Sequence, residues 1–573
     1  MAGAGGGLSG SLKRGLIGLA ALALLVPASA PARDDTPDAL RAQAFEAAQW
    51  AMSSEAADAL ALVSARFAQG DDALARLAER REALVVERDR LERRLEGLYV
   101  SEDAAALTAR AEARQAWEAA NRDLAAADVD IRARFPAYAD LTNPRALAVD
   151  RVQALLKPDE ALLLVLVNPE ATYVWGVTRE RVVWARSDLG ETEIDAAVQT
   201  LRSSLTATAA RGDNLALYAG PQPPVFQRAV AYDLYTELVR PVEAAFEGKT
   251  TLVTVATGSL ATLPFSVLTT APPHGRDASR RALAATPWLI DRYALAALPS
   301  VSSLESLRCH LASAGTRSPG CLTGGPAARP ARPTGSPLAA YGAPLLTGAP
   351  DDSGRGAEGA DMIGGGRLAD VAKLRALPYL KGSQQELEAL KARYPSALVR
   401  MGAEATEGAV KADDRGALSE ARYVLFSTHG LMAGAAAAEP GLVLTPPDEA
   451  SELDDGYLSA SEAAQLRLNA EFVVLSACNT AASDGRPGGE GLSGLARAFF
   501  YAGARSVLVS HWAVSDAATT TLITSAFADL DAGGARPAAR ARALQAGVRE
   551  VRKDPRWSHP AYWAPFSLVG DPG

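Results

Sequence analysis

The chain contains 573 residues, enough for roughly three to four domains. Hydrophobic residues make up 48% of it, and the mean hydropathy is close to zero, as in folded globular proteins. The formal net charge of −9 and the isoelectric point near 5.4 argue against a nucleic-acid partner, because nucleic-acid-binding domains usually present a basic face.

Residues 1–32 have the pattern of a secretory signal peptide. Lys13 and Arg14 precede the apolar run 15–26, which is too short to span a bilayer comfortably. Small residues follow it, and we expect cleavage after Ala32. The sequence therefore predicts an exported bacterial protein, periplasmic or secreted, with no membrane span after cleavage. The alternative is an uncleaved segment that anchors the chain to the membrane.

Residues 33–150 are predicted to form a helical N-terminal region. Leucines recur along one face of a helix over 73–99, and a second helix over 102–134 should end before Pro136. No 34-residue repeat is readable, so a tetratricopeptide array is not indicated. Two interpretations stay open for the helices of 35–134: a solvated helical pair packed on its neighbour, or a surface that binds a regulatory protein partner.

Residues 151–311 are predicted to form an α/β block, because apolar runs of strand length alternate with helical segments. The expected strands are 161–168, 172–178, 182–186, 214–219 and 250–256. The following segment, 312–376, is rich in Gly, Pro and Ala, and we expect it to be a flexible loop or linker.

The chain has three cysteines, Cys309, Cys321 and Cys478. In an oxidising compartment Cys309 and Cys321 can pair across a short loop. Cys478 would then remain as the odd free thiol, a pattern typical of a reactive cysteine. With so few cysteines we predict no metal site, and no cofactor-binding motif is present.

Residues 377–573 contain the two residues that point to chemistry. A helix is expected over 382–394, with Ser383 and Glu386 in capping-box spacing. His429 and Cys478 each follow an apolar run, 423–428 and 472–477. Because parallel strands end at a common edge of a sheet, the imidazole and the thiol should meet there. Their separation, 478 − 429 = 49, is close to the spacing of about 50 in caspases.

The sequence thus predicts a cysteine peptidase with a His429–Cys478 dyad. A neighbouring imidazole favours the thiolate, which is the nucleophile. The backbone N–H groups of Gly430 and Cys478 are the expected oxyanion hole. The non-catalytic alternative is that Cys478 is a buried structural cysteine and that His429 is a histidine at a turn. Nothing in the sequence identifies a group that orients His429.

The segment after the strand 503–510 should shape a substrate pocket. Trp512 can form a wall, His511 lies beside it, and Asp516 can receive a cationic side chain. The alternative for Asp516 is the N-cap of the helix expected over 515–530, or an acidic residue in its first turn.

Several segments resemble the CHAT peptidases, caspase-like relatives of separase in clan CD. The strongest are FSTHG (426–430), DGYLSASEAAQLRLNAEFVVLSACNT (455–480), GEGLSGLARAFFYAGARSVLVSHWAVSD (489–516) and HPAYWAPFSLVGD (559–571), with weaker matches at 263–265, 297–304 and 377–390. The resemblance covers roughly residues 150–573. It implies a three-layer α/β fold built around a parallel sheet, with a pseudo-caspase half (151–311) and a catalytic caspase-like half (377–573).

The resemblance places His429 and Cys478 on the catalytic pair of the family. Separase-like relatives carry an acid matching Asp516 that selects a basic residue before the cut. His511 stands where the family usually has Leu, and Ala513 stands where it often has Pro. The family's preference for the residue before the cleaved bond therefore does not carry over directly. Two functions follow: an exported endopeptidase acting on protein or peptide substrates, or a non-catalytic caspase-like scaffold whose helices bind a partner.

Overall fold

The computed structural model describes residues 36–52, 104–134, 146–206, 224–310, 337–348, 368–431, 440–478, 494–532 and 536–573, with a few short pieces between them. The predicted signal peptide, most of the helix expected over 73–99 and the strand expected over 214–219 lie outside these residues. Within them, no helix combines the length and the apolar character needed to cross a bilayer.

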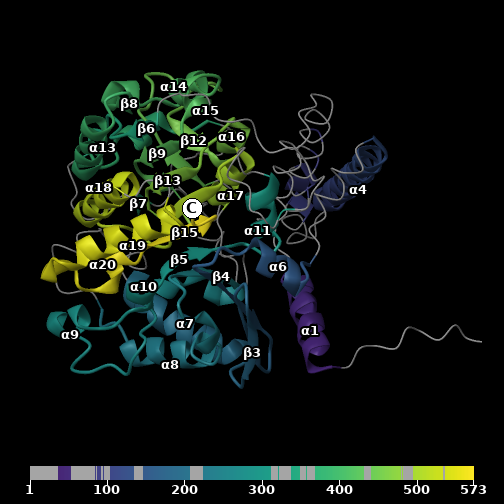
Figure 1. Cartoon of the computed structure of the whole chain (residues 1–573). Helices are drawn as coiled ribbons and strands as arrows, with labels where there is room; N and C mark the ends of the chain where they lie inside the picture. Colours follow the sequence, from purple (N-terminus) through teal and green to yellow (C-terminus); the bar gives the residue numbers. More distant parts are fainter. Residues whose placement is uncertain are drawn as a thin grey trace, which may run out of the picture.

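An eleven-stranded, mostly parallel sheet forms the centre of the molecule (Figure 1). Its spatial order is β3-β2-β1-β4-β5-β15-β14-β13-β9-β6-β8. The strands are β1 (Glu160–Val167), β2 (Thr172–Val177), β3 (Val182–Ser187), β4 (Thr251–Ala256), β5 (Ala294–Ala297), β6 (Leu338–Gly342), β8 (Leu398–Met401), β9 (Tyr423–Ser427), β13 (Phe472–Ser476), β14 (Ser506–Ser510) and β15 (Phe566–Gly570).

Helices cover both faces of the sheet because its central strands are apolar on both sides. In β1, for example, Leu163 joins one hydrophobic core and Leu164 joins the other. The first core is covered by α7 (Glu191–Thr206), α8 (Arg228–Leu238), α9 (Arg280–Ala284), α10 (Leu289–Arg292), α13 (Lys381–Arg393), α18 (Asp516–Ala532), α19 (Ala539–Arg552) and α20 (Pro560–Trp563). The second is covered by α6 (Val149–Leu155), α11 (Ser303–Glu305), α14 (Glu407–Asp413), α15 (Ala417–Glu420), α16 (Ala460–Gln465) and α17 (Gly494–Tyr501). The predicted three-layer α/β fold is confirmed.

The last strand of the chain, β15, joins the two halves of the sheet. It runs antiparallel to β14 over five residue pairs and parallel to β5 at a single pair, Val569 opposite Ala297. The carboxyl ends of β5 and β14 consequently lie toward opposite edges of the sheet. The halves are connected by one continuous sheet, but its seam between β5 and β15 is narrow.

One sequence-based prediction is wrong in part. The supposed linker 312–376 contains β6, which pairs with β8 and β9 inside the sheet and is fully buried. Three of the five residues of this strand, Ala339, Ala340 and Gly342, are small, and Gly- and Pro-rich segments surround it, so the composition resembles that of a linker. Helix α12 (Val371–Arg375) also lies in that range.

The N-terminal region contributes helices α1 (Pro37–Ala51) and α4 (Ala104–Arg134) to the described residues. Helix α1 packs on the first half of the sheet. The ring of Phe45 meets that of Trp175 edge-on with centroids 6.4 Å apart, and the Gln49 side chain exchanges two hydrogen bonds with the backbone of Leu147. In Figure 1 both helices lie to one side of the sheet.

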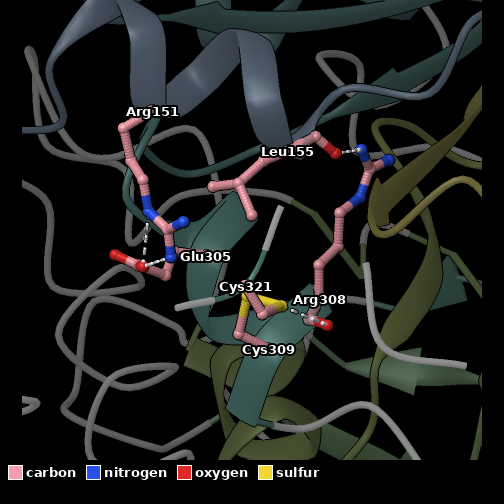
Figure 2. Close-up of a disulfide and its surroundings, with 6 residues drawn as sticks. All are labelled: Arg151, Leu155, Glu305, Arg308, Cys309 and Cys321. Atoms are coloured by element: carbon pink, nitrogen blue, oxygen red, sulfur yellow. Dashed lines mark hydrogen bonds and ion pairs between the residues drawn. A yellow bond between two sulfur atoms is a disulfide. The ribbon is translucent and has the colours of Figure 1, made fainter. Parts of the chain in front are cut away.

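A disulfide, drawn in Figure 2 beside the side chain of Arg308, and a buried ion pair of that arginine stabilise the end of the first half. Cys309 and Cys321 are joined by an S–S bond. The neighbouring Arg308 is 3% exposed and donates two hydrogen bonds of 2.7 Å to the carboxylate of Glu160, which is 0% exposed. Arg308 also contacts Asp571 next to β15, so one guanidinium connects the beginning of β1 to the last strand.

We predict that Arg308→Met destabilises the protein by about 3–5 kcal/mol, because it leaves the buried Glu160 carboxylate without its cation. Urea denaturation followed by circular dichroism measures the change. The control is Lys553→Met, which breaks the exposed Lys553–Glu550 pair and should have little effect. Equal stability of the two variants would contradict the structural role of the Arg308–Glu160 pair.

Candidate active site

The pairing of β9 with β13 brings His429 and Cys478 to equivalent positions at one edge of the sheet. The two strands are parallel, with Tyr423 opposite Phe472 and Ser427 opposite Ser476. This register has an offset of 472 − 423 = 49 residues, the same as the separation of His429 and Cys478. Each residue therefore lies two positions beyond the end of its strand, at the same level.

Cys478 belongs to the hydrophobic core on one face of the sheet. Helices α13 and α18 cover this face, and Figure 1 shows both helices. Cys478 is 1% exposed and does not take part in the disulfide. Its Sγ accepts a hydrogen bond of 3.2 Å from the backbone N–H of Val514. A hydrogen-bond donor to sulfur favours the thiolate, whereas burial favours the neutral thiol.

His429 is held by a backbone carbonyl that sequence reasoning did not identify. Its Nε2 lies 2.8 Å from the backbone oxygen of Pro378. Pro378 lies in the turn just before α13, which begins at Lys381. A carbonyl oxygen only accepts, so Nε2 carries the proton in this contact, and a neutral imidazole then has its lone pair on Nδ1. Pro378 O thus fixes both the orientation and the tautomer of the ring.

Gly430 allows the two loops that follow β9 and β13 to approach closely. A Cβ at this position would overlap the carbonyl oxygen of Cys478 and would lie 3.4 Å from the Cβ of Ala477. Gly430 also begins β10 (Gly430–Leu431), a strand of a small sheet with β7 (Gly356–Ala357), β11 (Gly441–Val443) and β12 (Tyr457–Ser459). The backbone beside His429 is therefore constrained by both sheets.

Polar side chains of α13 form hydrogen bonds with the last residues of β9 and β13. Ser383 donates from its hydroxyl to the carbonyl of Ser427 and accepts a bond of 2.9 Å from Ala343 N. Glu386 is 0% exposed and accepts a bond of 3.1 Å from the hydroxyl of Ser476. The predicted capping box is wrong, because α13 begins at Lys381 and both residues lie within the helix. Their i, i+3 spacing instead places them on the buried face.

The three residues expected at the substrate pocket are all buried but lie in different surroundings. Trp512 is 1% exposed, and its indole N–H donates to the oxygen of Ala561 at 3.0 Å. Asp516 is the first residue of α18, and its carboxylate accepts the backbone N–H of Gly382 at the start of α13. Figure 1 shows these two helices side by side.

His511 makes its side-chain contact with the last strand of the sheet. Its Nε2 lies 2.9 Å from the hydroxyl of Ser567 on β15. Burial, assisted by the positive charge of Arg202, lowers the pKa of His511 to about 3, so the imidazole is neutral at physiological pH.

We predict that Gly430→Ala destabilises the protein by about 1–3 kcal/mol, because the new methyl group forces the loops of His429 and Cys478 apart. Gly494→Ala in α17 is the matched control, since its Cβ would meet no atom closer than 3.6 Å. Thermal unfolding of both variants measures the difference. A Gly430→Ala protein as stable as the control would show that the loops do not need this close approach.

Comparison with known proteins gives three kinds of match. Two proteins called tetratricopeptide repeat protein 28 are similar: that of Mus musculus is 36% identical over 113 residues, and that of Homo sapiens 34% over 118. These matches cover 20% and 21% of this chain and 4% of each relative, so the chain spans a small fraction of their length.

Among solved structures, the separase–securin complex of Saccharomyces cerevisiae at 2.6 Å resolution is similar, with a TM-score of 0.42 and 10% identity. That match covers 82% of this chain and 34% of the separase chain. A second structure of the complex, at 3.0 Å, gives a TM-score of 0.37 at 10% identity and covers 85% of this chain and 37% of the other.

The remaining match is to a family model. The CHAT domain model aligns with residues 228–571, more than half of the chain, and includes both His429 and Cys478. This range also contains β15 and the helices that cover the two strand ends. The protein therefore belongs to the CHAT domain family.

Proposed function

We propose that this protein is an exported cysteine endopeptidase that cleaves protein substrates through a Cys478–His429 dyad. The observation that carries the proposal is the shared register of β9 and β13, which sets the two residues at one level of one sheet edge. The orientation of His429 by Pro378 O adds the third group that an imidazole base needs.

In this mechanism Sγ of Cys478 attacks the carbonyl carbon of the scissile bond while its proton passes to Nδ1 of His429. The backbone N–H groups of Gly430 and Cys478 stabilise the oxyanion, an effect of about 3–4 kcal/mol per donor in a studied protease. His429 returns the proton to the leaving amine, and a thioester remains. Water then attacks the thioester carbon and gives a proton to His429, the C–S bond breaks to release the carboxylic acid product, and His429 returns that proton to Sγ.

Burial of the two side chains supports a latent enzyme. His429 and Cys478 are each 1% exposed, so a substrate carbonyl reaches Sγ only after neighbouring segments move. The hydrogen bond from Val514 N–H to Sγ belongs to this closed arrangement. Activation on this proposal opens the site without moving the two strands that align it.

We propose that the enzyme prefers substrates with a basic residue just before the cleaved bond, and that Asp516 binds this residue. Its carboxylate is 4% exposed and accepts the N–H of Gly382 in the closed arrangement. A substrate cation would compete with that hydrogen bond, and charge-assisted pairing favours the cation. Trp512 would provide the adjoining wall of the pocket.

Export and protein partners are part of the same proposal. The Cys309–Cys321 disulfide supports an oxidising compartment, because disulfides persist there and are rare in the cytosol. Helices α1 and α4 are proposed to carry a binding surface for a regulatory protein. The alternative function is a non-catalytic scaffold; the burial of the thiol is the observation that favours it.

The direct test is labelling by an electrophilic peptide probe before and after limited trypsin digestion. We expect labelling of the wild type after digestion, complete loss in Cys478→Ala and a decrease of about 10²-fold or more in His429→Ala. His274→Ala, at an exposed position, is the control and should label normally. Labelling that persists in Cys478→Ala, or none in the wild type, would favour the scaffold.

The preference is tested by profiling cleavage of a peptide library with the activated protein and with Asp516→Asn. The wild type should cut after Arg or Lys, and the variant should lose that preference because the buried negative charge is gone. Lack of any preference for basic residues in the wild type would exclude Asp516 as the selective group while leaving the dyad untouched.

A further inference from the structure

A cavity of about 280 Å³ lies at the seam of the sheet, where β5 and β15 pair at only one position. Its lining comes from both halves: β4, β5 and the residues after β4 on one side, and β14, β15 and α19 on the other. Met52, at the end of α1, closes part of it and is itself 3% exposed. The cavity therefore lies where the two halves of the sheet meet.

The lining excludes a charged ligand. Among the described residues that line the cavity there is no Asp, Glu, Lys or Arg, and the walls are mainly aliphatic and aromatic, with Leu544 and Phe566 as examples. His511 is its one titratable lining residue among the described residues, and burial keeps its imidazole neutral at physiological pH. Moving an ion into such surroundings is costly, whereas an apolar molecule gains by entering.

Ser266 gives the cavity a hydrogen-bonding group. It is 6% exposed, it lines the cavity, and within the described residues its hydroxyl has no hydrogen-bond partner. A buried hydroxyl without a partner costs about 1–3 kcal/mol, which a ligand with one polar group can recover. The His511–Ser567 pair lies in the same lining and is already satisfied internally.

The volume is sufficient for a small organic molecule. An engineered apolar cavity of about 150 Å³ stays dry and binds benzene, and ligand pockets begin near 300 Å³. The volume of this cavity falls between those two values and can hold a ligand of one or two fused rings or a short branched chain.

The cavity is connected to Cys478 by four consecutive residues. His511, at the carboxyl end of β14, lines the cavity, and Val514 donates its backbone N–H to Sγ of Cys478. Trp512 lies between them and donates its indole N–H to the oxygen of Ala561. A shift of His511 caused by an occupant would therefore change the position of the donor on the thiol.

We propose that this cavity binds a small, neutral, largely apolar molecule with one hydrogen-bonding group held by Ser266, and that its occupancy changes the reactivity of Cys478 through residues 511–514. The proposal depends on thiol reactivity alone and holds whether or not the protein cleaves peptides.

The probe for the test is 2-naphthol, which is neutral at pH 7 and carries one hydroxyl. Binding to the full chain is measured by isothermal titration calorimetry, and the rate of Cys478 alkylation by iodoacetamide is measured with and without the probe. We expect saturable binding with one site. Ser266→Ala should weaken it about fivefold, and the probe should change the alkylation rate of the wild type about fivefold.

Two further variants separate the outcomes. Ala256→Leu fills the cavity and should abolish both effects, whereas Ala111→Leu, on the exposed face of α4, should retain both. Ser266→Ala removes one oxygen without adding volume, so it tests the site even where Ala256→Leu fails to fold. Absence of binding, or binding unaffected by both cavity variants, overturns the site. Binding with an unchanged alkylation rate overturns the link to Cys478.

Discussion

The pairing of two short parallel strands determines where the chemistry of this protein can occur. β9 and β13 contribute five residue pairs in a single register, and both are buried on two sides, so a slip by one residue would turn every apolar side chain to the wrong core. The same register sets His429 level with Cys478. Because the cores on both faces enforce the register, the alignment of the two functional groups follows from the stability of the fold itself.

Groups from α13 and the turn before it then fix the positions of the residues at the ends of β9 and β13. Pro378 orients the imidazole, and Ser383 and Glu386 contact the last residues of β9 and β13. All three belong to α13 or to the turn before it. A displacement of α13 would therefore alter both strand ends together, and its contact with Asp516 of α18 makes the start of the two helices one unit.

A second constraint operates at the seam between the halves. β15 pairs with β14 along its length but meets β5 at one position, and the connection is reinforced by Arg308, which bonds both Glu160 and Asp571. This arrangement leaves the cavity lined by His511. Both hydrophobic cores extend across the seam and hold the halves together, while the cavity leaves room for an occupant between β5 and β15.

The sequence predicted the parts of this structure that depend on local pattern. Continuous apolar runs identified β1, β2, β4, β9, β13 and β14, because buried parallel strands carry few polar residues. It failed for β6, whose Ala339 and Ala340 bury little surface each and follow a Gly- and Pro-rich stretch. It also failed for Ser383 and Glu386, since capping spacing and a buried polar helix face look alike. Pro378 acts through a carbonyl that every residue has, 51 positions from His429, so no side-chain pattern could reveal it.

The central claim is that the imidazole of His429 acts on the thiol of Cys478 across the common sheet edge. The most direct measurement is the pH dependence of Cys478 alkylation in the wild type and in His429→Ala, with both proteins folded and both opened by the limited digestion that exposes the thiol. We predict that the wild-type thiol titrates below the ordinary value of about 8.5 and that the variant titrates at or above it. Identical titration curves in the two proteins would contradict the proposed dyad.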